Sequence, residues 1–123
     1  MRDEKQNVAR EDLRDRTKRF AVRIARMFTA LPKTSLAQVF GKQVLRSGTS
    51  VGANFREAFR ARSSAEFTAK LEDCLKELDE TAYWLELLAE TEVVKMERLR
   101  DLLDESSQLI AILTAIVKKQ RRT

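Results

Sequence analysis

The chain of 123 residues carries 24 lysines and arginines against 19 acidic residues, a net charge of +5, with one cysteine and no histidine. This length is enough for one domain whose core needs no disulfide or structural metal. The absence of histidine excludes Ser-His and Cys-His nucleophiles, zinc sites with histidine ligands and Glu-x-x-His di-iron sites, and a single cysteine excludes an internal disulfide.

The first predicted helix spans about residues 11–31 and ends before Pro32, which cannot continue a helix. Apolar residues recur along it every three or four positions, as on the buried side of a helix. That side is predicted to carry Leu13, Thr17, Phe20, Ile24, Met27, Phe28 and Leu31. The polar residues 1–10 are predicted to be frayed.

The second predicted helix spans about residues 35–62, with Leu36, Phe40, Val44, Val51, Phe55 and Ala58 on its buried side. Gly41, Gly48 and Gly52 lie inside it, although each glycine costs a helix up to about 1 kcal/mol relative to alanine. We favour one continuous helix over a break at Gly48, because the apolar spacing continues across the glycines. Residues this small would let a neighbouring backbone approach closely.

The third predicted helix opens at Ser63 and continues to about residue 91. Ser63 and Glu66 have the Ser-x-x-Glu spacing of a capping box. Its buried side is predicted to carry Phe67, Leu71, Cys74, Leu78, Leu85 and Ala89. The fourth predicted helix spans about residues 95–119, with Leu99, Leu102, Leu103, Ser106, Leu109, Ile110, Leu113, Ile116 and Val117 on its buried side.

Four amphipathic helices of similar length joined by short connections predict an all-α fold, an antiparallel up-down-up-down four-helix bundle. We expect residues 1–123 to form one domain, with 1–10 and 120–123 frayed. No apolar run approaches the roughly 20 residues of a membrane helix, and the charged N-terminus lacks the apolar segment of a signal peptide. These features favour a cytoplasmic protein.

Charge is distributed unevenly along the chain. The net charge is +5 over residues 1–34 and +4 over 35–64, but −7 over 65–92. The predicted cationic rows on the first two helices are Arg16, Arg19, Arg23, Arg26, Lys42, Arg46, Arg56 and Arg60. Three interpretations stay open: contacts to nucleic-acid phosphates, contacts to the acidic third helix of another subunit, or a solvated surface with weak local ion pairs.

Two further features lie beside the apolar faces of the second and third helices. Ser47, Ser50, Asn54 and Glu57 are predicted to form a buried polar network with the third helix, neutralised by Arg46 or Arg56. A metal or catalytic carboxylate site is the less favoured alternative. Exposed aromatic residues are enriched at interfaces, so we predict an oligomer interface at Glu77, Glu80, Tyr83, Trp84 and Leu87. Cys74 is predicted to be a core residue.

Two segments carry a family resemblance. One is LRSGTSVGANFREA at residues 45–58; the other comprises Phe67, Lys70, Leu71 and KELDETAYWLELL at residues 76–88. Together they resemble the signature of four-helix bundle proteins called 23S rRNA intervening-sequence proteins. The resemblance covers about residues 15–118 and departs at Phe55, where an aliphatic residue is commoner.

The resemblance implies an up-down bundle, a homopentameric ring and kinship with the accessory variability determinants of diversity-generating retroelements. It brings no enzymatic activity and no catalytic residues. We therefore favour a non-enzymatic, homo-oligomeric protein that binds RNA, DNA or a nucleic-acid-processing protein through its cationic rows. The alternative is a protein-protein assembly module without a nucleic-acid role. We expect no metal, cofactor, membrane partner or small-molecule substrate.

Overall fold

The computed structural model describes residues 4–122, apart from the side chains of residues 5–8. This part of the chain forms four α-helices and no strand: α1 (Glu4–Thr29), α2 (Ser35–Phe59), α3 (Ser64–Glu90) and α4 (Met96–Arg121). The all-α prediction is confirmed. No helix of the described residues is long and apolar enough to cross a membrane.

The segments predicted to be frayed, residues 1–10 and 120–123, overlap the ends of the first and last helices. Residues 4–10 belong to α1, and α4 continues through Gln120 to Arg121, whereas residues 1–3 and 123 lie outside the described part. The Arg10 guanidinium lies 3.9 Å from the centre of the Phe67 ring, a cation–π contact that holds the first turns of α1 against α3. The Arg121 guanidinium pairs with the Glu72 carboxylate and holds the last turn of α4 in the same way.

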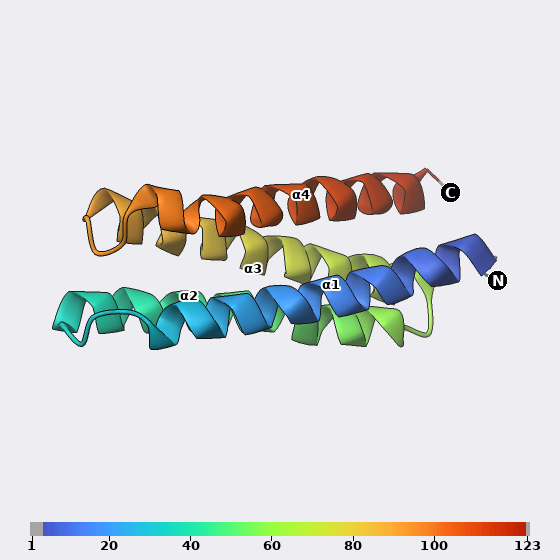
Figure 1. Cartoon of the computed structure of the whole chain (residues 1–123). Helices are drawn as coiled ribbons and strands as arrows, with labels where there is room; N and C mark the ends of the chain where they lie inside the picture. The colour runs from blue at the N-terminus through green and yellow to red at the C-terminus, as the bar shows by residue number, and fades with distance from the viewer. Residues whose placement is uncertain (1–3, 123) are drawn as a thin grey trace.

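The helices pack as a ring of neighbours: α1 on α2, α2 on α3, α3 on α4, and α4 loosely on α1. Figure 1 shows that the three connections lie at alternate ends and that both termini lie at the same end. This arrangement is consistent with the predicted antiparallel four-helix bundle.

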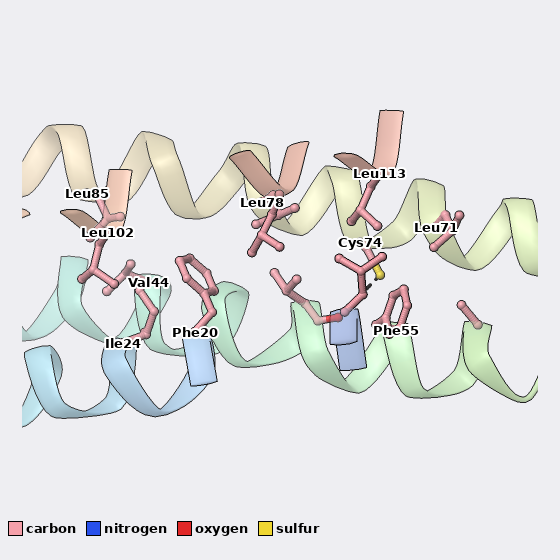
Figure 2. Close-up of a cluster of buried hydrophobic side chains, with 14 of the residues drawn as sticks. Phe20, Ile24, Val44, Phe55, Leu71, Cys74, Leu78, Leu85, Leu102 and Leu113 are labelled. Carbon is pink, nitrogen blue, oxygen red and sulfur yellow. Dashed lines mark hydrogen bonds between the residues drawn. The ribbon is translucent and has the colours of Figure 1, made fainter. Parts of the chain in front are cut away.

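The apolar sides of the helices meet in one core (Figure 2), which includes Phe20, Ile24, Val44, Phe55, Leu71, Leu78, Leu85 and Leu113. Burying side chains of this size stabilises the fold by about 1.5–3 kcal/mol each. The predicted buried side of α2 is wrong at Leu36, which is 45% exposed. Ala37 is buried in its place, because only one residue of that first turn faces the core.

The three glycines of α2 lie against α1, and the helix runs through them without a break. A Cβ atom at Gly41 would lie 2.6 Å from Leu31 Cδ1, and one at Gly48 would lie 2.9 Å from Ile24 Cγ1. At Gly52 it would lie 3.3 Å from the backbone oxygen of Thr17. The glycines therefore allow the predicted close approach, and α1 is the neighbour that approaches.

Side-chain caps fix the starts of α2 and α3 but not that of α4. The Thr34 hydroxyl accepts a hydrogen bond from the Ala37 amide, and the Ser63 hydroxyl accepts one from the Glu66 amide. The Glu66 carboxylate accepts from the Arg62 amide in return, so the predicted capping box is present, shifted by one residue. Lys95, the residue before α4, makes no side-chain cap.

Candidate nucleic-acid interface

Six of the eight predicted cationic residues form an exposed set on α1 and α2 that makes no ion pair within the described residues. We call this set the cationic surface; it comprises an α1 row, of which Arg23 and Arg26 lie next to α4, and an α2 row, of which Arg60 lies next to α3. Its members are Arg19, Arg23, Arg26, Lys42, Arg56 and Arg60. α1 and α2 pack against each other, while α3 carries more acidic residues than any other helix of the chain. Exposed guanidinium and ammonium groups without partners are the groups that contact phosphates.

Arg16 does not belong to this surface, contrary to the sequence prediction. Its Nε and Nη2 atoms donate to the two Glu105 carboxylate oxygens, each at 2.7 Å, and Nη2 also donates to Gln108 Oε1 at 2.8 Å. The guanidinium lowers the pKa of Glu105, and the hydrogen bonds from Arg16 are the largest cause. Arg16 therefore joins α1 to α4 and is occupied inside the single chain.

Arg46 is also paired within the chain. Its Nη1 donates to Glu77 Oε2 at 3.3 Å, and its Nη2 donates to the Glu80 carboxylate. Of the two arginines expected to neutralise carboxylates of α3, Arg46 does so. Glu77 and Glu80 were predicted as contacts to another subunit, but in the single chain they hold α2 on α3.

The predicted buried polar network shrinks to one pair of hydroxyl groups. The Ser47 and Thr81 oxygens lie 2.8 Å apart in a hydrogen bond between two fully buried side chains. Ser50 is half-buried and donates to the backbone oxygen of Arg46, and Asn54 is half-buried. Glu57 is exposed and pairs with the Lys70 amine at 2.8 Å. Ser50, Asn54 and Glu57 lie at the edge of the α2–α3 contact and not inside it. The prediction that they form a buried network was therefore wrong.

An exposed apolar patch lies where the start of α2 meets the second half of α3. We define it as Leu36, Val39, Phe40, Tyr83, Trp84 and Leu87. The Trp84 ring lies 5.8 Å from the Phe40 ring and 5.1 Å from the Tyr83 ring, while Val39 and Tyr83 are 58% and 54% exposed. The sequence predicted the α3 half of this patch. It missed the α2 half. Val39 could have indicated this half, because it is a large apolar residue outside the predicted buried side of its helix.

Cys74 lies in the hydrophobic core, as predicted. Burial raises the pKa of the Cys74 thiol to about 12, and this fully buried thiol hydrogen-bonds to the backbone oxygen of Val51 at 3.5 Å. Among the described residues, no group of three or more histidine, cysteine, aspartate or glutamate side chains is placed to hold a metal ion.

Comparison with known proteins places this arrangement in a family. The family model described as "23S rRNA-intervening sequence protein" matches residues 11–115. The chain belongs to this family. The resemblance carried by residues 45–58 and 76–88 is thus confirmed at the family level, while the predicted kinship with accessory variability determinants stays a prediction.

A solved family structure has the same fold. It is a crystal structure of a protein with unknown function from the S23 ribosomal protein family of Bacteroides thetaiotaomicron VPI-5482. The two chains are 42% identical and superpose with a TM-score of 0.83, covering 89% of this chain and 97% of that one. No curated protein matches the chain.

Proposed function

We propose that this family member is a non-enzymatic, homo-oligomeric accessory protein that binds nucleic acid or a nucleoprotein through the cationic surface. The observation that carries the proposal is the set of six exposed, unpaired cations on α1 and α2. By contrast, Arg16, Arg46, Lys70 and Arg121 pair with carboxylates of neighbouring helices. Exposed cations that no neighbouring carboxylate neutralises are suited to an anionic partner.

RNA is the first nucleic acid to test, because the family description names 23S rRNA. Phosphate contacts release counterions, so binding of this kind weakens steeply as salt concentration rises. The cationic surface contains arginines along one side of α1, spaced by three and four residues, which follow a helix ridge. This arrangement suits a run of phosphates more than a single anionic group.

The experiment compares two triple variants of equal charge. Arg19→Gln, Arg23→Gln and Arg26→Gln remove three cations of the cationic surface, while Lys76→Gln, Arg100→Gln and Lys118→Gln remove three exposed cations from α3 and α4. RNA affinity is measured against salt concentration. The first variant is expected to reduce the salt slope by about 2–3, and the control to leave it nearly unchanged.

Equal losses in the two variants would show that only net charge matters and would contradict the assignment of the surface. Helix content and melting temperature, measured by circular dichroism, confirm that both variants remain folded.

Homo-oligomerisation, as a pentamer, is the second part of the proposal, and the apolar patch supports it. Leu36, Val39 and Tyr83 expose large apolar side chains next to Phe40 and Trp84. Burial of such a patch between subunits is favourable, and aromatic side chains are the usual centres of interfaces. Tyr83→Ser combined with Val39→Ser is expected to lower the native mass measured by sedimentation, whereas Ala111→Ser on α4 is not.

The same patch favours one competing function, a protein-protein assembly module without a nucleic-acid role. That module would show an oligomer that responds to Tyr83→Ser and Val39→Ser, and no salt-dependent RNA or DNA binding. The nucleic-acid proposal predicts that both properties are present in the wild-type chain.

A further inference from the structure

A groove of about 670 Å³ opens at one end of the bundle. It lies between the last turns of α1, the loop from α3 to α4 and the first turns of α4, which share one end of the bundle in Figure 1. Its floor is apolar, with the buried Leu31, Leu99 and Leu102 and the half-buried Val94. Volumes in this range accommodate small organic groups.

The groove exists because α1 packs much less closely on α4 than on α2. The Arg16–Glu105 pair ties the two helices together farther along, and Arg16 itself does not line the groove. Leu99 and Leu102 belong to the core, yet they also form the floor of the groove. The site is therefore built from rigid helix positions as well as from the loop.

The rim of the groove is mainly cationic. Arg23, Arg26, Lys95 and Arg98 surround it, with Glu92 and Asp101 as the acidic members, so the rim carries a net charge of +2. All six side chains belong to exposed residues. An apolar floor with guanidinium groups at its edge matches a ligand that has a flat apolar part and a neighbouring anionic part.

The groove is also continuous with the cationic surface. Arg23 and Arg26 line both the groove and a shallow hollow along α1, where Lys18, Arg19 and Val22 are their neighbours. A chain of phosphates that follows the α1 arginines therefore arrives at the groove. In a nucleic acid each phosphate is linked to a nucleoside, so a base lies beside each phosphate.

We propose that the groove receives an unpaired base of single-stranded RNA, while Arg19, Arg23 and Arg26 contact the flanking phosphates. This inference rests on the proposed function and narrows it to a preference for single strands. Unstacked bases can stack on guanidinium planes, whereas the bases of a duplex are already paired and stacked within it. The cations of the rim supply both the stacking planes and the charge.

The test uses the wild-type protein and three probes with equal numbers of phosphates: a single-stranded RNA without self-complementarity, an RNA duplex and an abasic strand. Base stacking contributes about 1–3 kcal/mol per base, so the single strand is expected to bind at least about fivefold more tightly than the abasic strand. It is also expected to bind more tightly than the duplex.

A groove variant locates the effect. Ala30→Glu places a carboxylate at the groove, and Ala111→Glu adds the same charge on an exposed position of α4 away from it. Ala30→Glu is expected to remove most of the preference for the base-bearing strand over the abasic strand. Ala111→Glu is expected to keep it.

The failures of the two proposals differ. Equal affinity for the base-bearing and abasic strands, with steep salt dependence, would overturn the groove proposal and leave the phosphate interface standing. A preference that survives Ala30→Glu would also overturn the groove as its site. Absence of salt-dependent binding to every probe would overturn both.

Discussion

Helix α1 makes two different contacts, a close one with α2 and a loose one with α4. On the α2 side, glycines bring the helices so near that added Cβ atoms would overlap Leu31 and Ile24. On the α4 side, Arg16 and Glu105 form an ion pair across a wider gap, which opens into the groove at one end. The difference indicates that one side of α1 stabilises the bundle through packing, while the other leaves exposed charge and a groove, where we propose that a partner binds.

The largest expected effect comes from filling the close contact. Gly48→Val adds atoms where even a Cβ would lie 2.9 Å from Ile24 Cγ1 and Cγ2, near the root of that side chain. Overpacking of this kind costs about 1–3 kcal/mol, and we expect the upper half of that range. Urea denaturation at one protein concentration measures this loss in the free energy of unfolding. Ala53→Val, at an exposed position of α2, is the control, and equal stability of the two variants would contradict the close packing.

The loose contact is expected to depend on the Arg16–Glu105 pair. Both side chains are partly shielded, with 27% and 14% exposed, and their hydrogen bonds are bidentate. A double-mutant cycle with Arg16→Met and Glu105→Gln should give a coupling free energy of about 1–2 kcal/mol. The same cycle at the more exposed Glu57–Lys70 pair should give a smaller value. A zero coupling at Arg16–Glu105 would mean that the pair does not hold α1 on α4.

The same pair predicts a pH dependence of stability. Because Arg16 lowers the pKa of Glu105 below its ordinary value of 4.5, the folded state favours the ionised carboxylate. The contribution is present above pH 4.5 and is lost as pH falls through the lowered pKa. The stability difference between the wild type and Glu105→Gln should therefore shrink below pH 4.5. A difference that stays constant down to pH 3 would contradict this assignment.

The smallest effect concerns the start of α4, which lacks the side-chain cap that Thr34 and Ser63 provide for α2 and α3. Lys95→Ser introduces a cap and should stabilise the chain by up to about 1 kcal/mol. Thermal melting followed by circular dichroism measures the gain. Because Lys95 also lines the groove, the same variant should bind single-stranded RNA more weakly despite its higher stability. Lower stability would contradict the absence of a cap.

Much of the fold could be predicted from local sequence. The spacing of apolar residues predicted the buried sides of the four helices, and the Ser63–Glu66 spacing predicted the capping box. The site was less accessible to sequence, because the partner of Arg16 lies 89 residues away and only the packing of α1 on α4 brings it near. Glu57 was misplaced because its spacing puts it at the edge of the α2–α3 contact, where it stays exposed and pairs with Lys70 of α3.

The contacts at the helix ends and the α2 half of the apolar patch could not be predicted, for related reasons. The first turns of α1 are held by Arg10 on Phe67, a contact between residues far apart in sequence. Leu36 continues the apolar spacing of its helix but has no neighbouring helix to cover it. The spacing of apolar residues predicts which side of a helix is apolar. It does not predict how many turns of that side a neighbouring helix covers.

The salt dependence of RNA binding by the wild-type chain tests the central claim most directly. If the six residues of the cationic surface contact phosphates of a single strand, the logarithm of the affinity should fall with the logarithm of the salt concentration, with a slope of up to about −4. A flat profile, or no RNA binding at low salt, would contradict the claim that this surface exists to bind nucleic acid.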